Sequence, residues 1–367
     1  MVAGGAVMIA GAIVIAVGAL VVAAWLTGRL CSMTAWLQPV DHPNERSLHV
    51  RPTPRTGGLA IWGGLAIGLA GSVLLERSGM RSWPADWPVQ VEAGMWIAGM
   101  VVLVGLVSFL DDRKSVPASV RLAIHTLAAS GAVAGAGLVV PAVMIPSVGA
   151  ISLGWLAAPA TVLFIVWMAN LYNFMDGMDG FAGGMTWLGF GFLSGIAWIG
   201  GHTLIFLLSL LISMAAVGFL FYNRPPARIF MGDVGSVPIG FLAASLAVMG
   251  VHDGVFDLWV PVLIFSPFIV DATVTVLRRM LQGQKFWRAH REHYYQRLVL
   301  AGWGHRKTML TEYALMLATG TTAVLYVHVT EPVRLAMLLA WVIAYAILAW
   351  GVRVMERNPG SRRVVGA

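Results

Sequence analysis

Five aspartates in this sequence fall within three short motifs, and they are the first candidates for chemistry. Asp111 and Asp112 lie in SFLDDRKSVPASVRL, Asp176 and Asp179 in NLYNFMDGMDGFAGG, and Asp233 in FYNRPPARIFMGDVGSVPIGF. Each motif joins two apolar segments, where charge is costly and is usually kept for function or for pairing. The three motifs together predict one shared polar site.

The first motif pairs two adjacent carboxylates. Adjacent like charges raise the pKa of one member, so one of Asp111 and Asp112 is a candidate proton acceptor while the other stays ionised beside a cation. Arg121 opens the apolar segment that follows. Solvated acids at a helix end are the alternative interpretation of the pair.

In the second motif, side chains with oxygen atoms recur every three residues at Asn170, Asn173, Asp176 and Asp179. On a helix, this spacing would place the oxygens on one side. Oxygen ligands at this density suit Mg²⁺, which keeps several waters and binds substrate phosphates as well. Uracil or sugar hydroxyls are the competing partners, and helix caps and turns are the structural alternative.

The third motif combines glycines with an acid. A Pro225-Pro226 turn leads to Gly232, Asp233 and Ser236 at the expected start of a helix. Glycine lets the backbone approach a phosphate, and the amides of a helix N-terminus favour a bound diphosphate. We expect Ser236 to cap this helix and Asp233 to hold a metal. The motif is not a Walker A loop, because no Gly-Lys-Ser/Thr follows.

A fourth segment, FWRAHREHYYQRLVLAGWGHRKT, places His290, His293 and Arg297 at positions i, i+3 and i+7. On a helix, this spacing predicts one cationic face that donates hydrogen bonds to an anionic partner. Zinc is disfavoured because no second Cys or His pair accompanies the histidines. An amphipathic helix on the membrane surface is the structural alternative.

Two further polar residues lie inside apolar segments. A carboxylate there needs a partner, and for Asp271 we expect Arg278 or Arg279. His125, one turn beyond Arg121, is interpreted as an interior histidine with satisfied hydrogen bonds rather than as a catalyst.

The elements that must position these residues are membrane spans. The 367 residues are 58% hydrophobic and 11% charged, which indicates a chain that packs in lipid. We predict an all-α, polytopic membrane protein with a single domain, residues 1–367, and about 11 transmembrane helices. The expected spans are 5–26, 57–75, 94–110, 120–139, 156–172, 183–200, 203–222, 236–251, 258–277, 309–328 and 333–352.

The basic residues predict the orientation. One set of alternate loops contains 21 of the 24 Lys and Arg residues, and the other contains only Arg77, Arg81 and Arg334. Because positively charged loops stay in the cytoplasm, the N-terminus should lie outside and the C-terminus, with a short basic tail at 353–367, should lie inside. The five aspartates then fall on the cytoplasmic face, where the net charge of +7 also concentrates and can meet anionic lipids.

Several other features and function classes are disfavoured. The single Cys31 makes no internal disulfide. The first 26 residues lack a basic segment and a cleavage site, so they are interpreted as a retained span. No soluble module for nucleic acid is present. A transporter is the main rival, but its acids should lie near the middle of the bilayer, whereas these aspartates stand at span ends.

Taken in order, the four segments resemble the polyprenyl-phosphate N-acetylhexosamine-1-phosphate transferases of glycosyltransferase family 4. The resemblance covers about residues 40–310 and rests on NLYNFMDGMDG, IFMGDVGS and VDHPNERSLHVRPTPRTGG. The last motif resembles the bacterial branch that initiates O-antigen and related glycans. AHREHYYQRL differs from the adjacent histidines of the phospho-N-acetylmuramoyl-pentapeptide transferases, whose activity is the alternative.

The resemblance implies a reaction, a cofactor and partners. An N-acetylhexosamine-1-phosphate would pass from a UDP-sugar to undecaprenyl phosphate and release UMP, with Mg²⁺, or Mn²⁺ in its place, on the diphosphate. The site would lie on the cytoplasmic face of the bacterial inner membrane. Membrane lipids are further partners, nucleic acid is not expected, and a homodimer stays open. The sugar stays open among GlcNAc, GalNAc, QuiNAc and FucNAc, and so does the glycan pathway.

The resemblance also implies residue roles. Asp111 and Asp112 would receive or orient the lipid phosphate, and the metal ligands would be Asn173 and Asp233. The full catalytic set would be Asp111, Asp112, Asp233 and His290, and the substrate contacts Asn170, Asp176, Asp179, Arg121, Asn223, His293 and Arg297. A phosphate monoester is largely dianionic at pH 7, and phosphoryl transfer depends mainly on positioning and charge neutralisation. These facts favour direct displacement over a covalent aspartyl phosphate.

Overall fold

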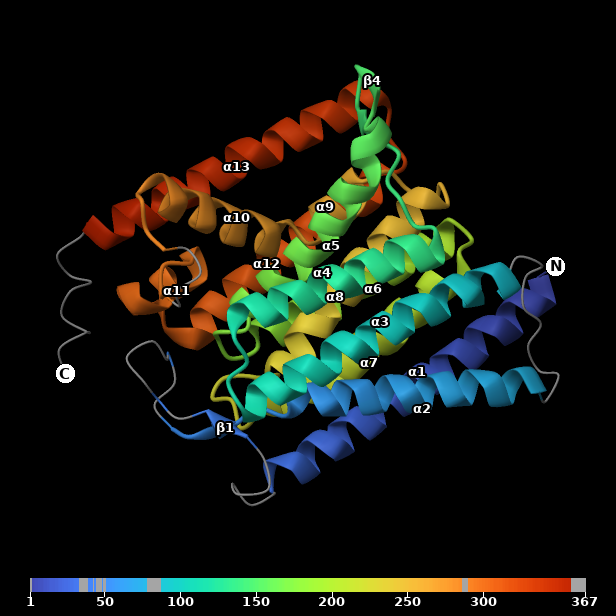
Figure 1. Cartoon of the computed structure of the whole chain (residues 1–367), viewed down its shortest axis with the longest axis horizontal. Helices are drawn as coiled ribbons and strands as arrows, with labels where there is room; N and C mark the ends of the chain where they lie inside the picture. Colours follow the sequence, from blue (N-terminus) through green and yellow to red (C-terminus); the bar gives the residue numbers. More distant parts are fainter. Residues whose placement is uncertain are drawn as a thin grey trace.

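The computed structural model describes residues 2–32, 39–41, 43, 48, 51–77, 87–285 and 290–357, without the side chains of residues 2–9 and 357. Long helices form one bundle, and two short hairpins lie at opposite ends of it (Figure 1). The helices are α1 (Val2–Cys31), α2 (Gly57–Arg77), α3 (Trp87–Arg113), α4 (Ala118–Ala136), α5 (Ala157–Phe174), α6 (Phe181–Ile199), α7 (Thr203–Asn223), α8 (Asp233–His252), α9 (Trp259–Ile264), α10 (Ser266–Leu281), α11 (Tyr294–Leu298), α12 (Gly304–Tyr326) and α13 (Glu331–Arg357).

Two antiparallel hairpins complete the described elements. Strand β1 (Val40–Asp41) pairs with β2 (Thr53–Pro54), and β3 (Ala142–Ile145) pairs with β4 (Gly149–Ser152). Short helical turns precede α5 at Gly154–Leu156 and α12 at Val299–Trp303. The hairpins are too short to form a second layer, so the fold is helical throughout.

Helices that suit a membrane dominate the described part of the chain. By length and composition, 8 of them can cross a bilayer: α1 from Ala10, α2, α3, α5 with its preceding turn, α6, α7, α8 and α13. This confirms a polytopic helical protein, but not the predicted number of spans. Helices α4 and α12 occupy the windows 120–139 and 309–328 without meeting the same criterion.

The prediction of one continuous span over 258–277 was wrong. Helix α9 ends at Ile264 and α10 begins at Ser266. Pro267 has no N–H to donate to the carbonyl of Leu263, four residues earlier. The hydroxyl of Ser266 donates to that carbonyl instead, at 2.7 Å. The broken helix frees α10 to take its own direction toward α11 and α13 (Figure 1).

Helix α8 forms the centre of the bundle. Every residue from Val234 to Gly250 is buried, as expected of a helix that is apolar on all sides. It packs against α2, α3 and α5. Its first residue, Asp233, therefore sits where several other helices end. By contrast, α13 exposes most of its apolar side chains, which suits a helix that faces lipid.

A close approach between α5 and α8 sets the position of their facing ends. A Cβ atom at Gly240 would lie 2.5 Å from the carbonyl oxygen of Met168 and 2.6 Å from the Cβ of Tyr172. Only glycine therefore allows the two backbones to approach this closely. The contact brings the last turn of α5, with Asn173, beside the first turn of α8.

The segment before α2 pairs with the segment before α8. The amide of Phe230 donates to the carbonyl of Pro54 at 2.7 Å, and those of Gly57 and Gly58 donate to Phe230 at 2.9 Å and Met231 at 2.8 Å. Gly58 and Gly235 face each other so closely that a Cβ on Gly58 would overlap the backbone of Gly235. These bonds hold the turn that leads to Asp233 against the start of α2.

Candidate active site

The structure brings polar side chains from four helices into one cluster. Asn173 Nδ2 donates to Asp233 Oδ1 at 2.8 Å and to Ser236 Oγ at 3.2 Å. Arg121 pairs with Asp111, and its Nη1 lies 3.5 Å from Asp233 Oδ2. These residues come from the end of α3, the first turn of α4, the last turn of α5 and the start of α8. The three motifs therefore meet at one end of the helices, as predicted.

The two adjacent aspartates make different contacts. Asp111 pairs with Arg121 and accepts a hydrogen bond from the amide of Val116 at 2.7 Å. Asp112 accepts from the amides of Asp233 at 3.2 Å and Val234 at 2.9 Å, and its side chain is only 1% exposed. Asp111 thus faces the cluster, whereas Asp112 lies beneath it.

The contacts of Asp112 show that two of our predictions about the start of α8 were wrong. The N-cap residue, Gly232, makes no side-chain cap, and Ser236 accepts from Asn173 instead of capping the helix. The amides of Asp233 and Val234, which we expected to bind a diphosphate, already donate to Asp112. A carboxylate from α3 therefore caps α8, because it reaches the amides that the helix cannot satisfy itself.

Asp176 lies in the turn between α5 and α6, close to this cluster. Burial raises the pKa of its carboxyl well above the ordinary range, and the negative charges of Asp233 and Asp112 raise it further. The backbone amide of Gly232 offsets part of this rise. Asp176 therefore shares one electrostatic environment with the aspartates of the other two motifs.

Two predicted substrate contacts, Asn223 and Asp179, join loops beside the cluster. Asn223 is 3% exposed, accepts from the amide of Gly180 at 3.0 Å and donates to the carbonyl of Ile229 at 2.9 Å. Asp179 accepts from the amide of Ala227 at 3.0 Å. Both side chains join the turn after α5 to the loop before α8, and these two segments lead to Asp176 and Asp233 of the cluster.

His305 belongs to the same support but carried no recognisable signal in the sequence. Its Nδ1 lies 3.2 Å from Asp179 Oδ1, and its Nε2 lies 3.2 Å from the carbonyl oxygen of Leu48. Burial alone would lower the pKa of this imidazole, but the nearby carboxylate of Asp179 and the carbonyl of Leu48 outweigh burial and raise the pKa. A single histidine beside basic residues has no spacing that distinguishes it from a surface residue.

The three-residue spacing of the second motif does not place its oxygens on one side. Helix α5 ends at Phe174, so Asp176 and Asp179 lie in the following turn rather than on the helix. Asn170 donates to the carbonyl of Val166 at 2.7 Å, within its own helix. Asn173, in the last turn of α5, donates a hydrogen bond to Asp233.

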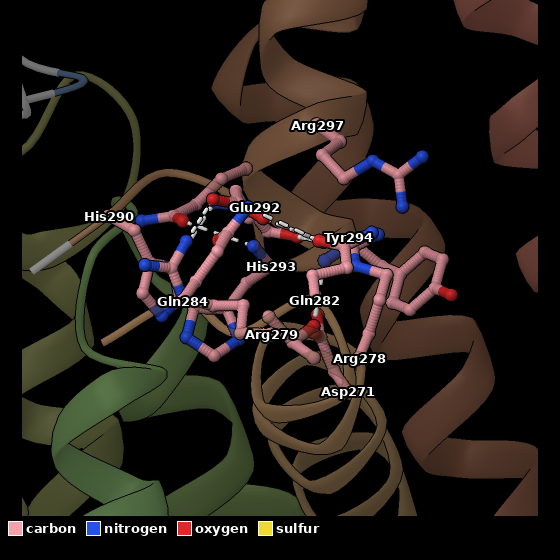
Figure 2. A network of polar contacts seen from close by, with 12 residues as sticks. Asp271, Arg278, Arg279, Gln282, Gln284, His290, Glu292, His293, Tyr294 and Arg297 are labelled. Carbon is pink, nitrogen blue, oxygen red and sulfur yellow. Dashed lines mark hydrogen bonds and ion pairs between the residues drawn. The ribbon is translucent and has the colours of Figure 1, made fainter. Parts of the chain in front are cut away.

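The predicted helical face at His290, His293 and Arg297 was also wrong. Helix α11 covers only Tyr294–Leu298, so His290 precedes it and His293 is its N-cap residue. Figure 2 shows the two histidines on one side of this segment and Arg297 on the other. Arg297 pairs with Glu356 of α13 at 2.5 Å. The short helix separates residues that a longer one would align.

Asp271 is the anchor of this segment, and its partners are not the expected arginines. It accepts from the amides of Tyr294 at 2.9 Å and Tyr295 at 3.1 Å, and Oδ1 lies 3.2 Å from His293 Nδ1 (Figure 2). Arg278 and Arg279 pair with Glu292 instead. A buried carboxylate that already binds two backbone amides has little need of a guanidinium.

Two histidines differ from their expected states. Burial, followed by the electrostatic effects of His293, Arg279 and Arg278, lowers the pKa of His290 to about 4. The imidazole is therefore neutral near pH 7. His125 is buried as expected, but its Nδ1 has no hydrogen-bond partner within the described part of the chain.

Comparison with known proteins identifies the family. The profile of glycosyl transferase family 4 matches residues 95–251. A Bacillus subtilis (strain 168) protein named probable undecaprenyl-phosphate N-acetylglucosaminyl 1-phosphate transferase is 32% identical over 313 residues, which cover 84% of this chain and 83% of the relative. The chain belongs to glycosyl transferase family 4.

Other members of family 4 are also similar to this chain. A decaprenyl-phosphate N-acetylglucosaminephosphotransferase of Mycolicibacterium smegmatis is 29% identical over 87% of this chain and 83% of its own. A phospho-N-acetylmuramoyl-pentapeptide-transferase of Synechococcus is 29% identical over 72% of this chain and 76% of its own. The region that matches the family profile runs from α3 to α8 and contains the whole cluster around Asp233, whereas Arg55 and the segment 290–305 lie outside it.

Proposed function

We propose that this chain transfers an N-acetylhexosamine-1-phosphate from a UDP-sugar to undecaprenyl phosphate, which starts a lipid-linked glycan. An oxygen of the acceptor phosphate attacks the sugar-linked phosphorus. The bond from that phosphorus to the bridging oxygen breaks, and UMP leaves with the bond's electrons. The cluster of Asp111, Arg121, Asn173 and Asp233 at one end of membrane helices carries the proposal, since it can bind a diphosphate at the membrane surface.

Arg121 is the residue that we propose contacts the diphosphate. Its side chain is 35% exposed and lies between Asp111 and Asp233. A planar guanidinium can keep one carboxylate partner while it donates to phosphate oxygens. Because the acceptor phosphate is largely dianionic at neutral pH, Asp111 needs only to orient groups or take a residual proton. Direct displacement therefore remains our proposal, and a phosphorylated aspartate trapped in a single turnover would contradict it.

The residues present fit a magnesium ion. Within the described residues, no three His, Cys, Asp or Glu side chains form a preformed metal site. Mg²⁺ is commonly bound through one or two carboxylates together with substrate phosphates, and Asp233 with the side-chain amide oxygen of Asn173 offers such a set. When bound, Mg²⁺ would neutralise the diphosphate.

The charges of the cluster support the same proposal. The negative charges of Asp233 and Asp112 raise the pKa of Asp176, and a divalent cation bound beside these carboxylates would relieve that repulsion. The nearby guanidinium groups are Arg121, on Asp111 and Asp233, and Arg55, on Asp112.

The test is UMP release by the purified full chain in lipid nanodiscs. We expect release that needs Mg²⁺, undecaprenyl phosphate and a UDP-sugar, with UDP-GlcNAc assayed first because two relatives are named for that sugar. Asp233→Asn should lower kcat by about 100-fold or more, as loss of a group that holds the metal on the diphosphate would. Arg113→Gln, at the exposed last residue of α3 beside Asp111 and Asp112, is the control and should keep its activity.

A panel of UDP-sugar donors identifies which sugar the chain transfers. UDP-GlcNAc, UDP-GalNAc, UDP-QuiNAc, UDP-FucNAc and UDP-MurNAc-pentapeptide should be assayed side by side, since a pentapeptide transferase is also among the relatives. Transfer of the pentapeptide donor alone would replace the hexosamine proposal. Absence of UMP release with every donor would contradict the proposed function.

A further inference from the structure

We propose that Arg55 is a positioning residue, which acts through Asp112 to hold the start of α8 so that Asp233 faces Asn173 and Arg121. The inference rests on the proposed function for its catalytic consequence. It assigns Asp112 to this support rather than to the lipid phosphate. Arg55 lies outside the region that matches the family profile.

The first observation is that both oxygens of the Asp112 carboxylate already have partners. Oδ2 accepts from the amide of Val234 at 2.9 Å, and Oδ1 accepts from the amide of Asp233 at 3.2 Å. Arg55 Nε lies 3.2 Å from Oδ1. With a side-chain exposure of 1%, this carboxylate has no face left for a phosphate, which would also be repelled by its charge.

The second observation is how Arg55 binds. Besides Nε on the carboxylate, Nη2 donates to the backbone carbonyl of Asp112 at 3.3 Å. The guanidinium therefore grips one residue at two points, which a lysine ammonium on a flexible stem reproduces poorly. This arrangement holds the end of α3 as well as the side chain of Asp112.

The third observation is that the backbone around Arg55 lies against the turn before α8. Gly232 has φ of 73°, and a Cβ there would overlap the carbonyl of Arg55. The neighbouring Phe230 donates to the carbonyl of Pro54 at 2.7 Å. Arg55 thus supports the turn with its main chain and, through Asp112, with its side chain.

Together these contacts explain why Asp233 points into the cluster. The backbone amide of Asp233 donates to Asp112, while its side chain contacts Asn173 and Arg121. Loss of Arg55 would leave the negative charge of Asp112 buried without its cation, so that carboxylate would move or take up a proton. Either change would loosen the start of α8.

The test compares Arg55→Gln, Arg55→Lys and Asp112→Asn with the wild-type chain in nanodiscs. Hydrogen exchange is measured on a peptide that contains residues 229–237, which carries the amides that Asp112 accepts from. We expect Arg55→Gln and Asp112→Asn to speed exchange there by about tenfold. Arg55→Lys, which keeps the charge but loses one of the two contacts, should fall between them and the wild type.

Kinetics give the second readout. In both Arg55→Gln and Asp112→Asn, the Mg²⁺ concentration for half-maximal activity should rise by about 10-fold to 100-fold, as for other residues that orient a metal ligand. The KM for undecaprenyl phosphate should stay unchanged. Because Arg55 acts through Asp112, the double variant should lose no more than Asp112→Asn alone. Arg113→Gln is again the control.

Two results would overturn the inference. One is unchanged exchange at residues 229–237 in Arg55→Gln and Asp112→Asn. The other is a rise in the KM for undecaprenyl phosphate without a change in Mg²⁺ dependence, which would make these residues phosphate contacts. If the wild-type chain released no UMP, the proposed function would fail, but the exchange comparison would still decide whether Arg55 and Asp112 hold the start of α8.

Discussion

Asp111 and Asp112 are neighbours in the chain, but their carboxylates lie in different surroundings. Consecutive residues of a helix point about 100° apart, so the end of α3 sends Asp112 toward the amides of α8 and Asp111 toward Arg121. The side chain of Asp111 is 9% exposed and that of Asp112 is 1% exposed. At the scale of single residues, the two neighbouring aspartates therefore have different roles: Asp111 lies beside the site, and Asp112 supports the start of α8.

Asn223, like Asp112, supports the site through backbone groups, and its removal should reduce stability. Asn223→Ala would leave the amide of Gly180 and the carbonyl of Ile229 without their side-chain partners. We expect a loss of about 1–3 kcal/mol in the free energy of unfolding, with an unchanged KM for the UDP-sugar in the protein that remains folded. Thermal unfolding in detergent and steady-state kinetics measure the two effects.

Ser209→Ala is the matched control for Asn223→Ala. Ser209 is buried on the same helix, but its hydroxyl has no partner within the described residues, so its removal should leave stability nearly unchanged. A raised KM for the UDP-sugar in Asn223→Ala, without a loss of stability, would instead identify Asn223 as a substrate contact.

His290 makes the stability of the chain depend on pH. The pKa of its imidazole is about 4 in the folded chain and 6.5 ordinarily. Between these values the unfolded chain binds more protons, so the folded state loses stability as the pH falls from about 6.5 to about 4. His290→Gln removes this loss, and its melting temperature should fall less across that range than the melting temperature of the wild type.

Melting temperatures across this pH range measure the effect. His328→Gln, at an exposed histidine far along the chain, controls for the loss of a histidine in itself. Parallel curves for His290→Gln and the wild type would show that the imidazole takes up protons equally well in the folded chain.

At the scale of elements, the packing of α5 on α8 sets the geometry of the cluster. Asn173 and Asp233 sit at the facing ends of these two helices, 60 residues apart in sequence, and a 2.8 Å hydrogen bond joins them. Gly240 allows the helices to approach because it has no side chain between them. A change in this contact should therefore reach the site although Gly240 is two turns away from Asp233.

Gly240→Ala tests this link. The added Cβ would meet the backbone of Met168, which cannot move aside as a flexible side chain could. We expect a loss of about 1–3 kcal/mol in stability and a fall in kcat, because Asn173 and Asp233 move apart. On α6, a Cβ at Gly195 meets nothing within 4 Å, so Gly195→Ala should be neutral or slightly stabilising. Equal behaviour of the two variants would contradict the close contact.

At the scale of the whole molecule, the helices place all the reactive motifs at one end of the bundle and the β3–β4 hairpin at the other (Figure 1). The basic residues predict that the reactive end faces the cytoplasm, where UDP-sugars are available. Val148 at the hairpin is 74% exposed, and Lys114, just after α3, is exposed at the opposite end. These two positions can report the orientation.

Cysteine labelling measures which end of the bundle faces the cytoplasm. In a Cys31→Ala background, a reagent that cannot cross membranes should label Val148→Cys in intact cells but label Lys114→Cys only after the membrane is opened. The reverse pattern would place the cluster outside the cell, away from its proposed donor, and would contradict both the orientation and the proposed function.

The sequence alone was enough to predict the helical membrane fold and the convergence of its acidic motifs. Hydropathy over about 20 residues is a local property, and the cost of charge beside lipid makes the few aspartates conspicuous. The break at Pro267 and the short α11 were missed, although both are local, because an apolar window and a helical spacing do not report where hydrogen bonding stops.

Only the tertiary structure decided which polar group each side chain meets. Asp112 caps a helix that begins 121 residues later, and Asp271 anchors the amides of Tyr294 and Tyr295 rather than an arginine on its own helix. Such partners depend on how close the helices pack, as at Gly240, and on where each helix ends. Residue types determine that a buried carboxylate needs partners, but the packing of distant segments determines which partners come within hydrogen-bond distance.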